Sequence, residues 1–167
     1  MILNHQNLLD WFYVLSIIDV NVVSVFKSSI FYFFFPFAVF HKVIGCVSIT
    51  RSKPSEARDR LNNQSKILLA EGRSIAMFPE GTRNTNPDQI LPFKLGAFHI
   101  AKNNKVPIKV FVISNLKNIV NLPRLWFDPS QTIFIKSLPL VPVKLVEEMT
   151  VHELSDHCRN LMNEAYN

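Results

Sequence analysis

The sequence predicts an α/β fold, a single domain over residues 1–167 with a mostly parallel β-sheet flanked by helices. Short apolar runs, many of them β-branched, alternate with longer stretches of helical periodicity, which is the pattern of βαβ units. These runs are almost continuously apolar, as strands are when helices cover both faces of a sheet. The 167 residues are enough for one substantial core, and no repeat, linker or change of composition marks a second domain.

The apolar runs give five predicted strands. They are Val20–Phe26, Val47–Thr50, Ser74–Phe78, Val106–Ile113 and Thr132–Ser137.

A helix is predicted from Leu8, and three further segments are predicted as helices. Pro54–Glu71 begins with a proline, which suits a first helical turn, and is followed by Gly72, which suits the residue after the last turn. Lys94–Asn103 is a shorter helix. The last helix begins at Thr150, where Glu153 stands three residues later and completes a capping box.

The composition narrows the class of partner. The chain carries 18 Lys and Arg against 13 Asp and Glu, a formal net charge of +5, which suits anionic lipid, nucleic acid or a phosphorylated substrate. The basic residues are scattered and no zinc-finger or RNA-binding signature occurs, so nucleic acid is not expected as a partner. Cys46 and Cys158 form neither a CxxC pair nor a disulfide framework, which favours a reducing, cytosol-facing compartment.

The first residues that could perform chemistry are His5 and Asp10. Residues five apart on one regular helix point about 140° away from each other. The two side chains can therefore meet only if His5 lies in a turn before the helix and Asp10 lies inside it. The carboxylate would then hold one imidazole nitrogen and leave the other free as a general base. A chance occurrence of His and Asp at this spacing is the alternative interpretation.

A second group of polar residues follows the predicted strand Ser74–Phe78. Loops at the carboxyl ends of strands in open α/β sheets commonly bind ligands. A planar guanidinium in such a loop can bind two phosphate oxygens at once, although a turn with a local ion pair is equally compatible with the residue types. The loop contains a carboxylate, a glycine, a hydroxyl and a guanidinium: Glu80, Gly81, Thr82 and Arg83. Arg51, after another strand, and Lys94, at the start of a helix, are further cations of this kind.

These residues belong to short sequence motifs. The order and spacing of the motifs resemble those of the four motif blocks of the glycerolipid acyltransferase family, specifically of the 1-acyl-sn-glycerol-3-phosphate acyltransferases. The resemblance covers most of the chain, from residue 4 to about residue 113. The matching residues are Asn4, His5 and Asp10 for NHxxxxD, Gly45, Ile49 and Arg51 for GxxxIxR, Phe78–Arg83 for FPEGTR, and Val106–Ile108 for VPI.

The resemblance implies a glycerol-3-phosphate acyltransferase-like fold and a defined reaction. A fatty acyl group would pass from acyl-CoA or acyl carrier protein to the sn-2 hydroxyl of 1-acyl-sn-glycerol-3-phosphate (lysophosphatidic acid), giving phosphatidic acid in phospholipid biosynthesis. His5 would be the general base and Asp10 would orient it. Neither a metal nor another cofactor is implied, because the acyl thioester is itself a substrate. The implied substrate-binding residues are Arg83 and Arg51 at the glycerol phosphate, Glu80, Gly81 and Thr82 in the shaping of the pocket, and Lys94.

The resemblance also implies association with the cytoplasmic face of a membrane. The family's apolar N-terminal segment and first strand have only Met1–Leu3 as their counterpart, so the anchor and the first strand are expected to be short or missing. No run of about 18 apolar residues predicts a transmembrane helix. The candidates for membrane contact are the Phe-rich stretch Ile30–Phe40 and the aromatic run Trp11–Tyr13.

Three alternatives stay open. The acceptor could be another lysophospholipid, since the pocket residues do not exclude one. The chain could be a catalytically silent lipid-binding remnant, because its first strand is so short. A metal hydrolase using His5 and Asp10 is the third, and it is disfavoured because no further ligand stands at a suitable spacing.

Overall fold

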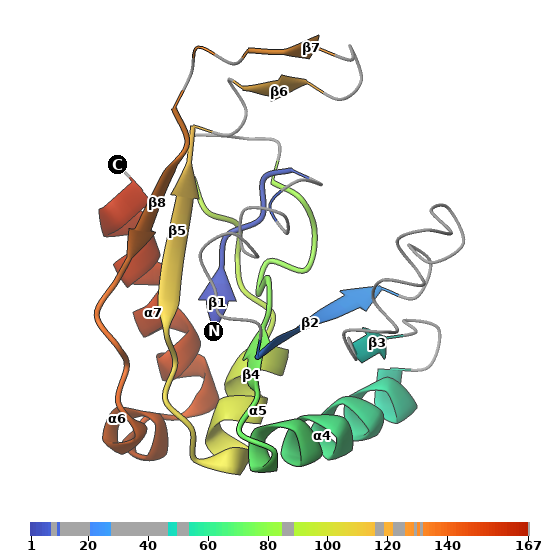
Figure 1. Cartoon of the computed structure of the whole chain (residues 1–167). Helices are drawn as coiled ribbons and strands as arrows, with labels where there is room; N and C mark the ends of the chain where they lie inside the picture. Colours follow the sequence, from blue (N-terminus) through green and yellow to red (C-terminus); the bar gives the residue numbers. More distant parts are fainter. Residues whose placement is uncertain are drawn as a thin grey trace. The chain divides into compact units, whose positions relative to one another are not determined.

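The structure is a computed structural model that describes residues 1–7, 10, 21–27, 47–49, 54–84, 89–115, 119–121, 126–128, 130 and 132–166 (Figure 1). The chain forms two compact units. Unit 1 comprises Met1–Ile17 and Phe78–Asn167, and unit 2 comprises Ile18–Met77. None of the helices in the described ranges is both long and apolar enough to cross a membrane.

The sheet of unit 1 places the start of the chain beside a central strand. Its order is β1-β5-β8, formed by β1 (Ile2–Leu3), β5 (Val110–Ser114) and β8 (Phe134–Ser137). β1 runs parallel to β5, with Ile2 opposite Val110 and Leu3 opposite Phe111, whereas β8 runs antiparallel to β5. Because β1 and β5 are parallel, the segment that follows β1 leaves the sheet at the same edge as the carboxyl end of β5.

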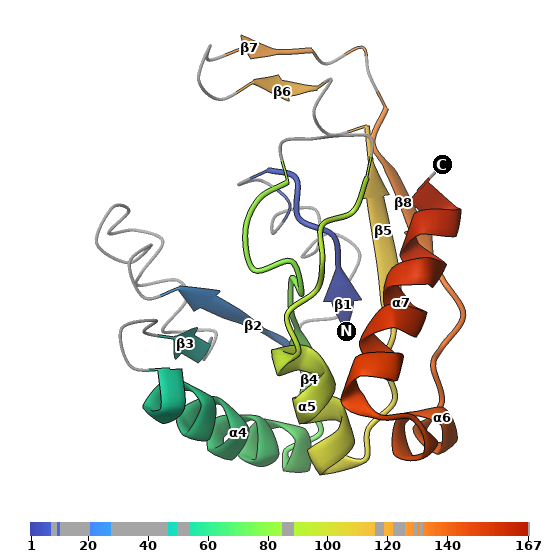
Figure 2. The same cartoon turned by 180° about the vertical axis from the view of Figure 1, so that it is seen from behind.

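Helices complete the core of unit 1. α7 (Val151–Tyr166) covers one face of β5 and β8 (Figures 1 and 2) and also contacts α5 (Gly96–Asn104). A short helix, α6 (Val143–Glu148), precedes α7. Apolar side chains at intervals of four along α7 face the sheet, which is the helical period expected for a buried stripe. The fully buried side chains of this core include Leu3, Val110, Val112, Phe98, Leu154, Cys158 and Met162.

The start of α7 confirms the predicted capping box. The backbone amide of Thr150 donates to Glu153 Oε2 at 2.7 Å, and the Glu153 amide donates to Thr150 Oγ1 at 3.3 Å. Two amides that a helix leaves without partners are satisfied in this way. At the end of α6 the Lys102 ammonium, from α5, donates to the carbonyls of Val146, Glu147 and Met149.

Unit 2 contains a sheet whose strands are all parallel. Its strand order is β3-β2-β4, with β3 (Val47–Ile49), β2 (Val22–Lys27) and β4 (Ser74–Ala76) all parallel. α4 (Pro54–Ala70) contacts β3 and β4. Gly72 ends this helix as predicted: its φ is +75°, and the Arg73 amide donates back to the carbonyl of Leu68 at 3.0 Å. Parallel strands with a helix between them confirm the predicted α/β class.

Several predicted boundaries differ from those of the structure. The strand predicted from Val106 begins only at Val110, because Pro107 has no amide to donate and Ile108 instead pairs with Val141, outside the named strands. The helix predicted from Lys94 begins at Gly96, and the Lys94 amide donates to the carbonyl of Pro79 at 2.8 Å. Three short elements were not predicted: β6 (Val120–Asn121), β7 (Trp126–Phe127) and α6.

Candidate active site

The predicted contact between His5 and Asp10 is present. His5 follows β1 in a turn, and its Nδ1 lies 2.7 Å from Asp10 Oδ2. The same carboxylate oxygen accepts the backbone amides of Gln6 at 2.6 Å and Asn7 at 2.9 Å. The Asp10 side chain is fully buried, while 22% of the His5 side chain is exposed. The carboxylate therefore fixes both the turn and the imidazole.

Two contacts hold the imidazole of His5, one at Nδ1 and one on the face of the ring. Its ring stacks on Phe78, with centroids 4.3 Å apart and planes inclined by 21°. In the neutral imidazole, the carboxylate beside Nδ1 favours the tautomer that has its proton on Nδ1 and its lone pair on Nε2. No described residue forms a hydrogen bond with Nε2. This arrangement leaves a positioned, partly exposed base at the sheet edge.

The backbone of His5 is clamped by the loop that follows β4. The His5 amide donates to Glu80 Oε1 at 2.6 Å, and the His5 carbonyl accepts the Asn84 amide at 2.6 Å. Glu80 is buried, and its Oε2 accepts the amide of Leu91 at 3.1 Å. Burial raises the pKa of the Glu80 carboxyl, and the hydrogen bonds from the His5 and Leu91 amides act in the opposite direction. The FPEGTR string therefore adjoins His5 through its backbone.

Asn4 extends the pairing of the two-residue strand β1. Its buried side-chain amide donates to the Ile113 carbonyl at 2.8 Å, and the Ile113 amide donates to its Oδ1 at 2.7 Å. The side chain thus takes the place of a backbone pair just beyond β1. It fixes the residue before His5 to the carboxyl end of β5.

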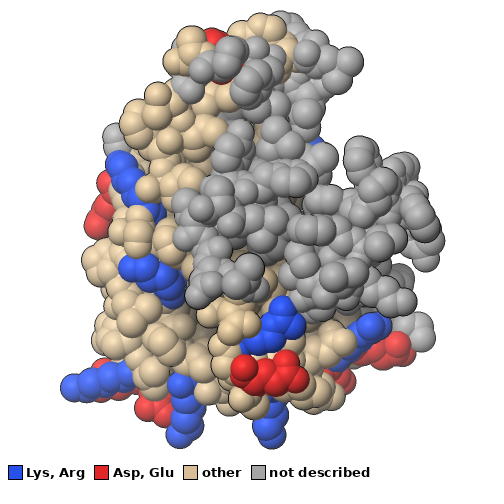
Figure 3. Space-filling view, viewed as in Figure 1, with Lys and Arg blue, Asp and Glu red and all other residues tan. Residues whose placement is uncertain are grey.

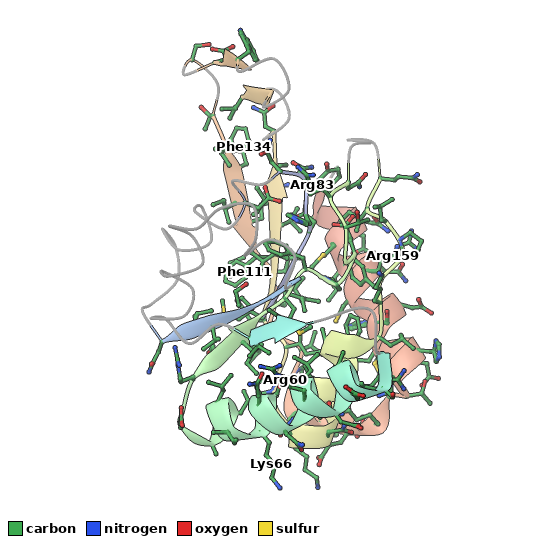
Figure 4. The ribbon with its side chains drawn as sticks, turned by 90° about the vertical axis from the view of Figure 1, so that its right-hand side faces the viewer. Arg60, Lys66, Arg83, Phe111, Phe134 and Arg159 are labelled. Carbon is green, nitrogen blue, oxygen red and sulfur yellow. The ribbon has the colours of Figure 1, made fainter. Side chains whose placement is uncertain are left out.

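Gly81 and Lys94 lie in direct contact. Gly81 has a φ of +66°. A Cβ at this position would lie 2.8 Å from Cδ of Lys94 and 2.9 Å from its Cε. A Cβ here would therefore require the flexible end of the Lys94 side chain to shift, and the positive φ favours glycine independently of the available space. Thr82 and Arg83 are exposed in the same loop, and Figure 4 labels Arg83 there.

The structure brings together most, not all, of the predicted site residues. His5, Asp10, Glu80, Gly81, Thr82, Arg83 and Lys94 all belong to unit 1. Arg51 lies outside the described residues. Phe78 and Asn4 were recognised as motif positions without a role. Asn84 and Leu91 were missed, because a backbone amide that donates to a residue distant in the sequence leaves no local pattern. Within the described ranges, no cluster of three or more His, Cys, Asp or Glu is arranged to hold a metal ion.

The chain is similar to known acyltransferases. A family model described as Acyltransferase matches residues 1–114. The 1-acyl-sn-glycerol-3-phosphate acyltransferase of Salmonella typhimurium is 36% identical over 163 residues, covering 98% of this chain and 64% of the relative. The Escherichia coli enzyme of the same name is 33% identical over 163 residues, again covering 98% and 64%. The chain therefore spans less than two thirds of the length of these relatives.

A solved structure shares the fold. The crystal structure of the 1-acyl-sn-glycerophosphate (LPA) acyltransferase, PlsC, from Thermotoga maritima superposes with a TM-score of 0.79 at 21% sequence identity. The match covers 99% of this chain and 63% of that chain. The predicted acyltransferase-like fold is confirmed.

Proposed function

Because the chain belongs to the acyltransferase family, we propose that it transfers a fatty acyl group from a thioester to the sn-2 hydroxyl of 1-acyl-sn-glycerol-3-phosphate. The product is phosphatidic acid. The observation that carries the proposal is the His5–Asp10 pair, joined at 2.7 Å with Nε2 of the imidazole left for a substrate. The names of the relatives from Salmonella and E. coli support the choice of acceptor.

The geometry gives each member of the pair a role. Nε2 of His5 removes the hydroxyl proton as that oxygen attacks the thioester carbonyl carbon. The C–O bond forms, the C–S bond breaks, and the leaving thiolate takes the proton from the imidazolium. Asp10 stabilises the imidazolium through Nδ1, and the stacked Phe78 ring keeps the imidazole in place. With a good leaving group, no nucleophilic side chain is needed, and alignment of the two substrates supplies much of the rate.

The proposed acceptor site uses the loop beside His5. Arg83 offers an exposed guanidinium to the phosphate, and Lys94 crosses the loop at Gly81. Glu80 and Thr82 are the other proposed substrate-binding residues of this loop. Arg51 is proposed as a second phosphate ligand from the sequence resemblance alone. The donor is acyl-CoA or acyl carrier protein, and no further cofactor is proposed.

We also propose that the protein works at the cytoplasmic surface of a membrane, where its lipid substrate resides. Support comes from the exposed aromatic side chains of Trp126 (49%) and Phe134 (54%), since aromatic residues favour the membrane–water interface. On the face shown in Figure 3 the described basic and acidic side chains are interspersed rather than gathered by sign. The earlier candidates, Ile30–Phe40 and Trp11–Tyr13, lie outside the described residues.

Purified protein tests the reaction directly. It is incubated with lysophosphatidic acid in detergent micelles and with labelled acyl-CoA or, separately, labelled acyl carrier protein. Phosphatidic acid should form with at least one donor and disappear in His5→Ala. The matched control is His99→Ala, at an exposed histidine of α5, which should retain activity. No product with either donor, from protein shown to be folded by circular dichroism, would overturn the proposal in favour of a silent lipid-binding protein.

The acceptor alternative needs its own comparison. Lysophosphatidylcholine carries a choline on its phosphate. The quaternary ammonium of the choline balances the single negative charge of the phosphodiester. If Arg83 binds the phosphate monoester, lysophosphatidic acid should give the higher kcat/KM, and Arg83→Met should reduce this preference. A higher kcat/KM with lysophosphatidylcholine would assign the enzyme to another lysophospholipid.

A further inference from the structure

We propose that α7 positions the active site through two of its side chains, Arg159 and Tyr166. The helix lies beyond residues 1–114, the part that the acyltransferase family model matches. The inference rests on the proposed function in one respect, the role of His5 as the base. The hydrogen bonds that carry it are properties of the fold.

The first connection runs from Arg159 to the backbone of His5. An NH2 group of Arg159 donates to the Ile90 carbonyl at 3.0 Å (Figure 4 labels Arg159 on α7). The amide of Leu91 belongs to the same peptide group as that carbonyl, and it donates to Glu80 Oε2 at 3.1 Å. The other oxygen of Glu80 accepts the His5 amide at 2.6 Å. One peptide group thus links the guanidinium to the carboxylate that holds His5.

This connection is polarised in one direction. A guanidinium on the carbonyl oxygen of a peptide group makes its N–H a stronger donor, because bonds in a hydrogen-bonded chain reinforce one another. Ile90 and Glu80 are both buried, so water does not readily replace a lost partner. Removal of the Arg159 guanidinium should therefore loosen the hold of Glu80 on His5.

The second connection runs from Tyr166 to the turn that contains Asp10. The side-chain amide of Gln6 donates to the Tyr166 hydroxyl. The backbone amide of the same Gln6 donates to Asp10 Oδ2 at 2.6 Å, on the oxygen that also binds His5. Tyr166 therefore restrains the residue that joins the base to its orienting carboxylate.

The two side chains act from one rigid support. Residues seven apart on a helix lie on nearly the same face, roughly 10 Å apart along the axis. α7 is anchored by the buried side chains of Leu154, Cys158 and Met162. Near its end the Lys136 ammonium donates to the Ala165 carbonyl at 2.6 Å. The helix thus connects the loop of residues 89–95 with the turn that contains His5 and Gln6.

Two variants test the proposal in the whole chain. Arg159→Met removes the guanidinium and keeps a long apolar stem, and Tyr166→Phe removes only a hydroxyl. Lys144→Met is the matched control for lost charge, because Lys144 is 83% exposed on α6. Arg159→Lys is the conservative rescue, since an ammonium can also donate to the Ile90 carbonyl. Thermal unfolding of each variant records its stability.

The first readout does not depend on activity. In protein labelled with 15N-histidine, the ring resonances of His5, assigned by their loss in His5→Ala, report how much of the imidazole has its proton on Nδ1. We expect Arg159→Met and Tyr166→Phe to reduce or broaden the Nδ1–H signal, with partial recovery in Arg159→Lys and no change in Lys144→Met. Unchanged His5 resonances in either test variant would overturn the proposal, whatever the change in stability.

The second readout separates this proposal from the proposed function. With acyl donor and lysophosphatidic acid, kcat should fall roughly tenfold in each test variant while KM stays within about twofold, because positioning of the base affects the chemical step. If the wild-type protein has no activity, the proposed function is overturned. The His5 resonances then test the role of α7 on their own. Active test variants with wild-type kcat would overturn the role of α7 and leave the proposed function intact.

Discussion

The buried carboxylate of Glu80 accepts the backbone amide of His5 at 2.6 Å, across 75 residues of sequence. Its second oxygen accepts the amide of Leu91. Both oxygens are thus engaged by backbone groups, and Glu80 acts on the site by holding His5. A direct contact between Glu80 and the substrate stays a prediction.

Glu80→Gln should therefore impair the proposed chemical step. A side-chain amide has one oxygen, so its NH2 group would face the amide of either His5 or Leu91, and two donors would oppose each other. We expect kcat to fall at least roughly tenfold and the free energy of unfolding to fall by about 1–3 kcal/mol. Steady-state kinetics and urea denaturation measure the two effects. Glu148→Gln, at an exposed glutamate of α6, should change neither; equal effects in both variants would contradict the role of Glu80.

The same residue predicts a pH dependence of stability. Burial raises the pKa of Glu80 above its usual value of 4.5, so the folded protein holds this proton more tightly than the unfolded chain does. The stabilising contribution of Glu80 is then complete below pH 4.5 and decreases as the pH rises through the folded-state pKa. Glu80→Gln abolishes this titration.

Urea denaturation at a series of pH values tests that sign. The free energy of unfolding of the wild type, minus that of Glu80→Gln, should decrease from about pH 4 towards pH 7. Glu148→Gln, measured over the same pH series, controls for the loss of a carboxyl group at an exposed position. A difference that increases with pH would mean that the folded-state pKa of Glu80 is lowered instead.

Phe78→Leu tests the stacking of the imidazole. Leucine fills much of the volume but offers no flat face, so the His5 ring should sample more orientations. We expect a several-fold fall in kcat with little change in KM, since stacked pairs contribute about 0.5–1.5 kcal/mol. Phe111→Leu is the control, because Phe111 is also partly buried but lies in β5 against Lys109. Equal losses of kcat in the two variants would show that general packing, and not the stack on His5, is responsible.

Asn4→Ala tests how a two-residue strand can hold the turn that contains His5. The substitution leaves the buried amide and carbonyl of Ile113 without their side-chain partner, and we expect a loss of about 2–4 kcal/mol in the free energy of unfolding. Asn103→Ala, at an exposed position of α5, should cost almost nothing. Denaturant titration compares the two, and a small loss in Asn4→Ala would mean that β1 is held by its backbone pairing alone.

The features predicted correctly from the sequence are those with local signals. The capping box at Thr150 and the terminal glycine of α4 depend on residues within one helical turn. Helix geometry gave the condition under which His5 and Asp10 can meet, and the resemblance to the NHxxxxD motif favoured that contact. The short elements β6, β7 and α6 are too small to show a hydrophobic period, and sequence patterning therefore missed them.

The remaining differences involve contacts between distant residues. Asn4 pairs with Ile113 across 109 residues, and Arg159 reaches Ile90 across 69. Such pairs leave no periodicity, so a single sequence cannot reveal them. Lys94 was predicted inside a helix, where its residue type fits. The structure places it before the helix instead, where its amide donates to the carbonyl of Pro79.

Gly81 and Gly72 form a matched pair for the last prediction. Both have positive φ, +66° and +75°. A Cβ on Gly81 would lie 2.8 Å from Cδ of Lys94, whereas a Cβ on Gly72 would meet nothing within 4 Å. Alanine at either position carries the strain of the left-handed conformation, about 1–2 kcal/mol. Only Gly81→Ala also displaces the Lys94 side chain.

If Lys94 helps to bind the phosphate of the acceptor, Gly81→Ala should raise the KM for lysophosphatidic acid several-fold, and Gly72→Ala should leave it unchanged at a similar loss of stability. Lys94→Ala should raise KM to a similar extent. In the double variant the two effects should not add, because the alanine at position 81 then has no lysine to displace. Equal KM values in the two glycine variants, or full additivity in the double variant, would show that Lys94 does not mediate the effect.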